Sequence, residues 1–358
     1  MGNTAIKKLL GVVLAIGAIG NASATPGTSL TQGNTPMITS GALPDSPGAH
    51  VDPNVASSRF SGVVSLAIQY DGSQYICSGT LVSKRQVVTA GHCVDTNGNG
   101  ALIDLKKPGN NVLAVFNSTS SGAGSSVIAA SKVSMHADYQ GFGNCPVGSG
   151  LTGQCVNDDV AVVTLNRDAP ASAKIYKIAT NELVSGTHII MAGYGTSGDG
   201  VNGYTVSPAF RVKRSGENYV DLFGLDDEHG RTGRAEIWYG DFDGGGKDTF
   251  CTRYGACSPV LPNNRESGIG GGDSGGPSFV EMYGELMLIA TNTFSNAAGY
   301  TAGTFGSYFG GMVLHSYLDY IAQETGGAAQ FVPEPGSVAV FGLGLLALAG
   351  VIRRRKQG

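Results

Sequence analysis

Three short segments of the sequence carry side chains that together could perform nucleophilic catalysis. Residues 89–93 (TAGHC) place His92 next to a cysteine, Asp159 precedes an apolar run, and residues 272–277 (GDSGGP) hold Ser274 in a glycine-dense turn. Hydrolysis of an amide or ester without a metal needs a nucleophile, a base that takes its proton, a carboxylate that orients the base, and donors for the oxyanion. The three side chains are candidates for the first three roles, and backbone N–H groups of the turn are candidates for the fourth.

The order of these segments resembles the trypsin/chymotrypsin family of serine peptidases. The resemblance rests on TAGHC at residues 89–93, DVAV from Asp159 and GDSGGP at residues 272–277, in the chain order His, Asp, Ser that distinguishes this family from subtilisins and α/β-hydrolases. It covers about residues 51–324, with large insertions. The fold that it implies is all-β, with two packed antiparallel six-stranded β-barrels, as in chymotrypsin, and a short C-terminal helix.

The resemblance also implies a role for each site residue. Ser274 Oγ would be the nucleophile, His92 the general base, and Asp159 the carboxylate that orients His92 and stabilises its charged form. The backbone N–H groups of Gly272 and Ser274 would form the oxyanion hole. Asp273 would pair with a newly released N-terminus and order the loop. The implied activity is that of an exported serine endopeptidase acting on protein or peptide substrates.

Two alternatives bear on this interpretation. Asp158 stands directly before Asp159, and we favour Asp159 because the apolar alternation of the following strand begins right after it. The chain could also be a catalytically inactive surface or binding protein on a trypsin-like scaffold. Such proteins commonly lack one catalytic residue, and none is missing here.

Two features depart from the family pattern. The residue six positions before Ser274 forms the base of the primary specificity pocket in the family, and here it is Gly268, followed by Ile269. Without a carboxylate at that base, a substrate Lys or Arg would be buried unpaired, so we expect no preference for these residues. The new N-terminus of the family is expected near Val51, but His50 precedes it and offers no site for a trypsin-like activator.

The composition favours many short strands. The 358 residues include 56 Gly and 14 Pro, and segments rich in β-branched residues alternate with clusters of Gly, Asn, Ser and Asp. These segments are residues 63–70, 75–82, 87–89, 160–165, 188–191 and 279–293. The pattern predicts an all-β barrel or sandwich. Only residues 314–324 show apolar side chains at helical spacing, which predicts an amphipathic helix that closes the domain.

The six cysteines fall into three pairs that are close in sequence. In an exported chain such pairs most simply form disulfides, here Cys77 with Cys93, Cys145 with Cys155, and Cys251 with Cys257. The family resemblance assigns the first pair to the disulfide that brackets the catalytic His. The six histidines are too far apart for a structural zinc site.

One segment has the spacing of a calcium loop. Oxygen-bearing side chains alternate and are followed by Gly100, the candidate ligands being Asp95, Asn97, Asn99 and Asp104. The twelfth position is Lys106 and not a bidentate Glu, so a solvated turn is the competing interpretation. Residues 239–244 allow the same two interpretations, and the turn is favoured more strongly there. No other cofactor is expected.

The N-terminal residues predict export. Residues 1–24 combine a basic start, an apolar run too short to span a bilayer and a small-x-small cleavage site, which together indicate a signal peptide. Residues 25–50 contain four prolines and no Lys or Arg, so we expect a linker or a short pro-segment. The peptidase domain is expected over residues 51–324, with an N-terminal barrel over about 51–178 and a C-terminal barrel over about 179–324.

The C-terminal residues resemble the bacterial PEP-CTERM sorting signal. A linker with a Pro-Glu-Pro motif (325–337) precedes an apolar helix (338–352) and a basic tail (353–358). The resemblance implies an exosortase-type sorting enzyme as partner and a cell-envelope or extracellular location. The apolar helix would anchor the chain to the inner membrane transiently or permanently. A plain C-terminal anchor is the alternative.

The charge of the chain argues against nucleic acid as a partner. The formal net charge is −4. Six basic residues lie in the two terminal segments, and their removal leaves 17 Lys and Arg against 27 Asp and Glu, a formal charge of −10. Such an acidic body repels phosphate backbones.

Overall fold

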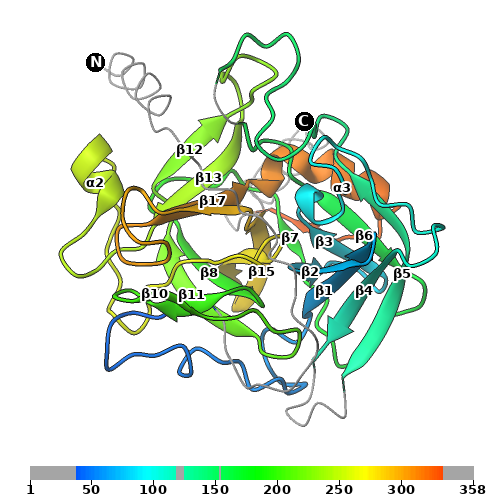
Figure 1. Ribbon diagram of the computed structural model, residues 1–358, viewed down its shortest axis with the longest axis horizontal. Coiled ribbons are helices and arrows are strands. Elements are labelled where there is room, and N and C mark those ends of the chain that lie inside the picture. Colours follow the sequence, from blue (N-terminus) through cyan, green and yellow to red (C-terminus); the bar gives the residue numbers. More distant parts are fainter. Residues whose placement is uncertain (1–37, 118–124, 153–154, 334–358) are drawn as a thin grey trace, which may run out of the picture.

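The computed structural model describes residues 38–117, 125–152 and 155–333. The predicted signal peptide (1–24), apolar sorting helix (338–352) and basic tail (353–358) lie outside the described residues. The described chain is built mainly of β-strands, which form two halves side by side (Figure 1). None of the helices in this part of the chain has the length and apolar character that crossing a membrane requires.

The first half is a closed antiparallel barrel of six strands, as the sequence predicts. Its strands, in the order in which they pair, are β1 (Val63–Tyr70), β2 (Ser73–Leu81), β3 (Gln86–Thr89), β6 (Ala161–Leu165), β5 (Ser126–Met135) and β4 (Asn111–Phe116). Alternate side chains of a strand point to opposite faces, and the inward set fills the barrel with fully buried residues such as Leu66, Val87, Ala114 and Val163.

The second half consists of two larger sheets and a hairpin. The first sheet has the order β11 (Arg214–Tyr219), β8 (His188–Gly193), β14 (Pro277–Met282), β15 (Glu285–Thr291), β7 (Ile178–Ala179) and β18 (Phe331–Val332). The second has the order β12 (Leu222–Leu225), β13 (Ala235–Asp241), β17 (Tyr308–Met312) and β16 (Phe294–Asn296). The hairpin joins β9 (Ser197–Asp199) to β10 (Gly203–Val206). Residues 331–332, expected in a linker, thus extend a sheet by pairing with β7.

The chain passes from one sheet to the other between β11 and β12. The N–H of Val220 donates to the Thr187 carbonyl at 3.0 Å, whereas the next N–H, of Asp221, donates to the Tyr239 carbonyl of β13 at 2.8 Å. A strand that switches sheets in this way makes a corner. Within the described residues this half therefore has two open sheets, and the second closed barrel expected from the family is not confirmed.

The helix predicted near the end of the domain is confirmed. A 3-10 turn, η2 (Leu314–Tyr317), leads into α3 (Leu318–Glu324), close to the predicted range of 314–324. Leu314, Tyr317 and Ile321 are almost fully buried and pack into the core of the second half. The helix lies near β5 and β6, so it also contacts the first half: Tyr320 Oη lies 3.1 Å from Ser134 Oγ on β5.

A second short helix, α2 (Thr249–Tyr254), does not follow from the apolar spacing. Asp248 caps its N-terminus by accepting the Cys251 N–H at 2.8 Å, and Gly255 ends it in the left-handed conformation with φ of 69°. Six residues are too few to display helical periodicity, which is why the sequence pattern misses this helix.

The three predicted disulfides are confirmed, and no cysteine of the chain is free. They join Cys77 to Cys93, Cys145 to Cys155 and Cys251 to Cys257, with Cα separations of 6.2, 4.7 and 4.3 Å. The first connects β2 to the turn that carries His92, whereas the other two close loops that lie outside the barrel strands.

Candidate active site

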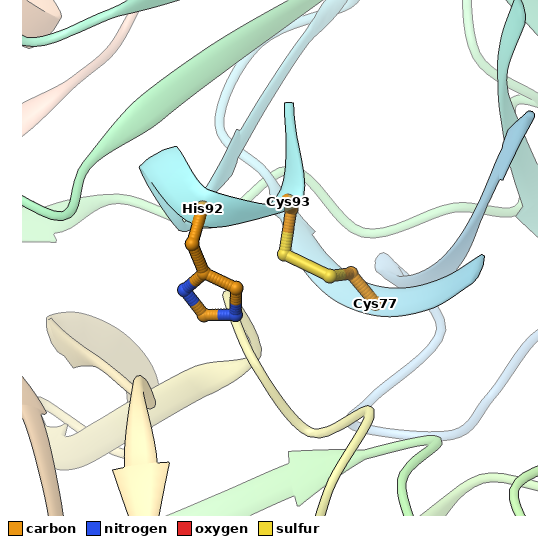
Figure 2. Close-up of side chains that lie close together, drawn as sticks. All are labelled: Cys77, His92 and Cys93. Carbon is orange, nitrogen blue, oxygen red and sulfur yellow. A yellow bond between two sulfur atoms is a disulfide. The ribbon is translucent and has the colours of Figure 1, made fainter. Parts of the chain in front are cut away.

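His92 lies on a short turn that is held from two sides. Strand β3 ends at Thr89, and the 3-10 turn η1 (Gly91–Cys93) follows at once. Figure 2 shows the disulfide from Cys93 to Cys77 next to the His92 side chain. The turn is therefore tied to β2 by a covalent bond directly beside the imidazole.

Asp159 is the carboxylate that contacts His92. One oxygen accepts the backbone N–H of His92 at 2.7 Å, and the other lies 2.8 Å from the imidazole Nδ1. The carboxylate is fully buried, and a Cβ on Gly91 would lie 3.1 Å from it. Since Asp159 accepts a hydrogen bond at Nδ1, Nε2 is the nitrogen left to take a proton.

The environment raises the pKa of His92 above the ordinary 6.5. Burial is the largest single influence and lowers the pKa, because it disfavours the charged imidazole. The charge of Asp159 and its hydrogen bond act in the opposite direction and together outweigh burial. The protonated form of His92 is thus stabilised in the folded chain.

Asp158 points to different partners. It is a non-glycine residue at φ of 60°, and its N–H donates to the Tyr317 hydroxyl at 3.0 Å. Its carboxylate lies 3.0 Å from His136 Nδ1. The structure therefore pairs Asp159 with His92 and separates Asp158 from it.

The turn around Ser274 requires glycine at two positions. Gly272 has φ of 103° and Gly275 has φ of 77°, both in the left-handed region that side chains disfavour. A Cβ on Gly275 would also come within 2.0 Å of Thr89 Oγ1. The turn thus packs against Thr89 at the end of β3, just before the segment that carries His92.

Two N–H groups of this turn have no acceptor in the described part of the protein. The N–H of Asp273 donates to the Gly270 carbonyl, that of Gly275 to the Asn292 carbonyl and that of Gly276 to the Asp273 carbonyl. The N–H groups of Gly272 and Ser274 donate to no described protein group. Two backbone donors next to the Ser274 side chain are therefore left for another acceptor, as an oxyanion hole requires.

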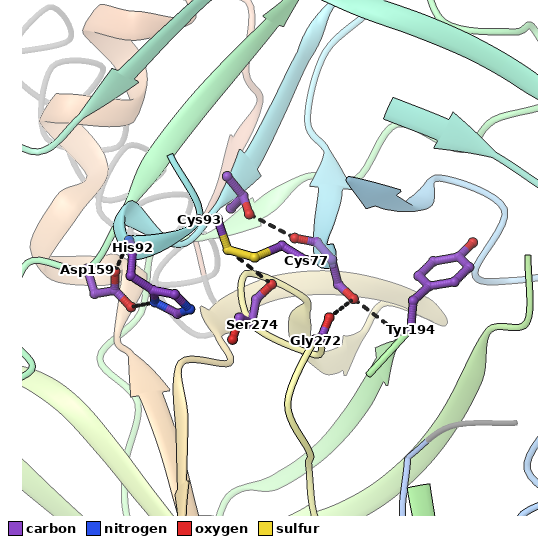
Figure 3. The surroundings of a disulfide bond; sticks show 9 residues. Cys77, His92, Cys93, Asp159, Tyr194, Gly272 and Ser274 are labelled. Atoms are coloured by element: carbon purple, nitrogen blue, oxygen red, sulfur yellow. Dashed lines mark hydrogen bonds and ion pairs between the residues drawn. A yellow bond between two sulfur atoms is a disulfide. The ribbon is translucent and has the colours of Figure 1, made fainter. Parts of the chain in front are cut away.

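Ser274 lies close to the Cys77–Cys93 disulfide and is 9% exposed. Its carbonyl oxygen is 3.7 Å from Cys93 Sγ and accepts the Ser78 N–H at 2.8 Å. In the view of Figure 3 the His92 ring lies between Asp159 and Ser274. The described residues contain no direct hydrogen bond from Ser274 Oγ to the imidazole, a contact that often tightens only when substrate binds.

Ser78 is a site residue that the sequence analysis overlooks. Its hydroxyl donates to the Gly272 carbonyl and accepts the Tyr194 N–H, both at 2.9 Å (Figure 3). Together with the bond from its N–H to Ser274, it joins β2 of the first half to the Ser274 turn of the second. A serine in a strand gives no distinctive signal, since its partners lie more than one hundred residues away.

Asp273 is fully buried and is held by backbone groups. Its carboxylate accepts the N–H of Gly195 at 2.7 Å and that of Gly270 at 2.9 Å. A Cβ on Gly193 would come within 2.2 Å of it, so the strand end beside it must be glycine. Burial raises the pKa of Asp273 to about 6, although both hydrogen bonds and the charge of Arg214 act to lower it.

The chain segment docked near this turn is not the one expected. Val51 is 38% exposed and forms an isolated backbone bridge with Arg214. Ile38, by contrast, is fully buried in the second half. Thr39 beside it donates its N–H to the Gly268 carbonyl at 3.3 Å, and Gly268 donates to Thr39 Oγ1 at 2.7 Å. Residues 38–39 thus pack beside Gly268, and the new N-terminus near Val51 stays a prediction.

The surroundings of the predicted pocket base are neutral at close range. A Cβ on Gly268 would lie 3.1 Å from Thr39 Oγ1 and 3.6 Å from the Phe242 ring. Ile269 is 3% exposed, and its carbonyl accepts the Tyr204 hydroxyl at 2.6 Å. These nearest neighbours carry no charge.

The predicted calcium ligands of residues 95–104 form a hydrogen-bonded turn. The carboxylate oxygens of Asp95 accept four backbone N–H groups, those of Asn97, Gly98, Gly100 and Ala101. The side-chain oxygen of Asn97 accepts the Asn99 N–H and shares the Ala101 N–H with Asp95, and the Asp104 carboxylate accepts the Lys106 N–H. Hydrogen bonds to the side chains of Asp95, Asn97 and Asp104 thus hold this turn, and calcium binding by the loop stays a prediction.

Comparison with known proteins supports the resemblance. Residues 54–215 match the family model described as Trypsin, and residues 331–356 match the PEP-CTERM protein-sorting motif. Serine protease SP24D of Anopheles gambiae is 32% identical over 126 residues, which are 35% of this chain and 39% of that protein. The chain thus matches about two fifths of that relative's length. The solved structure titled "HL collagenase structure at 1.7A resolution" covers 75% of this chain and 94% of its own, at 18% identity and a TM-score of 0.46. TAGHC, DVAV and GDSGGP in family order and the model match over residues 54–215 thus make this part of the chain similar to the trypsin family, and residues 331–356 match a PEP-CTERM sorting motif.

Proposed function

We propose that the chain is a serine endopeptidase in which Ser274, His92 and Asp159 form the catalytic triad. The observation that carries the proposal is the buried Asp159 carboxylate bound to both the N–H and Nδ1 of His92, on a turn packed against the turn of Ser274. The match to the trypsin family model and the similarity to a serine protease support the same conclusion.

In the proposed mechanism each group has one step. His92 Nε2 takes the proton from Ser274 Oγ as the oxygen attacks the substrate carbonyl, and Asp159 stabilises the imidazolium that forms. The N–H groups of Gly272 and Ser274 receive the negative charge on the carbonyl oxygen. His92 then gives the proton to the leaving amine. In the second half of the reaction water attacks the acyl-enzyme, and His92 takes the proton of the water and returns it to Ser274 Oγ as the acyl product leaves.

The proposal includes a preference for neutral side chains before the scissile bond. Gly268 replaces the acid that would pair with a substrate cation, and its closest neighbours are a hydroxyl and a phenyl ring. Burying a Lys or Arg there without a partner would cost several kcal/mol, of the order seen for unpaired buried charges.

Maturation would free a new N-terminus at Ile38. Thr39 exchanges hydrogen bonds with Gly268, and Gly270, two residues further on, donates its N–H to Asp273. Cleavage of the bond before Ile38 would therefore place an ammonium group on the segment that packs beside the Asp273 loop. The buried Asp273 carboxylate, which lacks an ion-pair partner at hydrogen-bonding distance among the described residues, would gain a counter-charge.

The two ends of the chain would direct export. The predicted signal peptide (1–24) and the PEP-CTERM motif support secretion and sorting by an exosortase-type enzyme. The apolar run 338–352 would hold the chain at the inner membrane until processing, and the catalytic body would lie outside the cytoplasm.

The first test separates an active peptidase from an inactive scaffold. A fluorophosphonate probe should label the folded, processed wild-type protein and should not label Ser274→Ala, because the probe reacts with an activated serine. The labelled preparation should cleave peptides with neutral residues before the scissile bond at least as fast as those with Lys or Arg. Absence of labelling in a folded, processed protein would establish the inactive alternative.

The second test uses two adjacent carboxylates as a matched pair. Asp159→Asn should lower kcat/KM by about 10⁴, because the imidazole loses the partner that fixes its tautomer. Asp158→Asn should leave kcat/KM within about threefold of wild type, since Asp158 does not contact His92. Steady-state kinetics with circular dichroism as a folding control measure both, and equal losses in the two variants would refute the assignment.

The pH profile of the same proteins gives a second readout. His92 acts as a base only when neutral, and Asp159 helps hold its pKa above 6.5, so kcat/KM should fall as the pH drops through that raised value. The protonated pair stabilises the fold fully below pH 6.5, and this stabilisation is lost as the pH rises through the raised pKa. Asp159→Asn should shift the acid limb to lower pH, and an unshifted limb would argue against the pair.

The third test locates the mature N-terminus. Mass spectrometry of the active form should find Ile38 as its first residue, and a variant that blocks this cleavage should lose activity while keeping its fold. An active form that starts at Val51, or that keeps residues before Ile38, would contradict the maturation step.

The fourth test concerns sorting. A chain truncated after Val332 should leave the inner-membrane fraction that the full chain enters, because it lacks the apolar run 338–352. Membrane fractionation followed by immunoblotting measures this, and an unchanged distribution would show that another segment anchors the protein.

A further inference from the structure

A group of five acidic side chains lies in the second half of the molecule, away from the candidate triad. It comprises Asp221, Asp241, Asp243, Asp248 and Glu266, which we call the β13 acidic cluster because Asp241 ends β13. Four of the five are 7% exposed or less, and only Asp248 is partly exposed. Buried carboxylates of one sign are costly unless each finds a partner.

The loop after β13 brings three of these carboxylates together. Residues 241–248 read DFDGGGKD, and Gly244, Gly245 and Gly246 all have positive φ, which lets the chain fold back tightly. One side-chain oxygen each of Asp241, Asp243 and Asp248 lies within 4.8 Å of the others. The loop therefore brings the carboxylates of Asp241, Asp243 and Asp248 close to one another.

Two buried carboxylate oxygens of this group have no hydrogen-bond partner. Asp241 Oδ2 accepts the N–H groups of Thr249 and Phe250, whereas its Oδ1 is buried and makes no hydrogen bond. Asp243 Oδ1 is likewise buried without a partner. Buried acceptors in folded proteins are almost always satisfied, so these two indicate a group that completes the site.

No protein cation balances the cluster within the described residues. None of the five acids forms an ion pair with a Lys, Arg or His there. Lys247 places its Nζ over the Tyr300 ring at 4.5 Å, and Arg253 donates to the Ala298 carbonyl at 2.7 Å.

We propose that the β13 acidic cluster binds a calcium ion, with Asp241, Asp243 and Asp248 as its carboxylate ligands. The ligands are all oxygen atoms, which hard cations prefer, and no nitrogen or sulfur ligand that would favour zinc belongs to the group. Calcium fits a flexible loop of glycines and carboxylates better than magnesium, which demands a rigid octahedron. Gly245 and Gly246 are exposed, so the site is open to solvent on one side.

The position of the site gives the ion a structural consequence. Phe242, between two of the ligands, donates its N–H to Ser307 and accepts the Gly306 N–H, both at 2.8 Å, and its ring faces Gly268. An ion bound by the flanking carboxylates would fix Phe242 beneath the segment that leads to Ser274. Calcium binding itself does not depend on the proposed peptidase activity.

A second acidic group provides an internal comparison. Asp158, Asp227, Glu228 and Glu236 also place one oxygen each within 4.8 Å of one another. Asp227 Oδ1 in this group is also buried without a partner. Unlike the β13 acidic cluster, however, this group has a basic side chain beside it, because His136 Nδ1 lies 3.0 Å from the Asp158 carboxylate, and Asn157 donates to Glu236 at 2.6 Å. We therefore place the ion at the β13 acidic cluster and use the second group as a control.

The test combines calorimetric titration with thermal unfolding of the EDTA-treated protein. Wild type should bind one calcium ion and show a higher Tm in calcium than in EDTA, because the ion binds only the folded chain. Asp243→Asn should weaken binding by about tenfold or more and lose most of the Tm gain. In EDTA the same variant should be at least as stable as wild type, because an amide at this buried position removes the cost of burying an ionisable carboxyl group. If Asp243 served only as a hydrogen-bonding residue, Asp243→Asn would be less stable than wild type in EDTA.

Matched variants decide where the ion binds. Glu236→Gln in the second group and Asp95→Asn in the first predicted loop should keep wild-type binding. If Asp243→Asn does not fold, Asp248→Asn at the partly exposed edge gives the same readout. The proposal is overturned if folded wild type shows neither heat nor a Tm gain with calcium, or if binding survives in the cluster variants and is lost in a control.

Discussion

The candidate active site depends on one set of hydrogen bonds, centred on Ser78, between the two halves of the molecule. Ser78 on β2 bonds to the carbonyls of Ser274 and Gly272 and to the N–H of Tyr194. The neighbouring Cys77 is joined to Cys93, and His92 adjoins Cys93. A few hydrogen bonds and one disulfide thus fix His92 of the first half relative to Ser274 of the second, an alignment that the proposed acyl transfer would need.

Buried carboxylates mark the places where the fold accepts an energetic cost. Asp159 is balanced by His92, and Asp273 by two backbone N–H groups. Asp241 and Asp243 each keep one oxygen without a partner. A buried charge is stable only when its surroundings compensate for lost water. These differences underlie the proposals that a released N-terminus pairs with Asp273 and that a cation binds at Asp241 and Asp243.

Local sequence patterns determined the elements and the chemistry. Alternating β-branched segments predicted an all-β barrel or sandwich, and the family resemblance implied the closed six-stranded barrel. Apolar spacing over 314–324 predicted the closing helix. The segments around His92, Asp159 and Ser274 were identifiable because each carries its signal within a few residues. The three disulfides were predictable for the same reason, since the cysteines of each pair lie at most 16 residues apart.

Tertiary structure decided whatever depends on contacts between distant segments. The sequence alone could not show that Ser78 supports the Ser274 turn, that Ile38 and not Val51 docks beside Gly268, or that the second half forms two open sheets. Residues 239–244 carried only a weak calcium signal, because the third proposed ligand, Asp248, lies outside this segment. The fold of the glycine loop brings Asp248 close to Asp241 and Asp243. Local patterns fix side-chain periodicity and turn chemistry, whereas register between remote strands follows from the packing of the whole core.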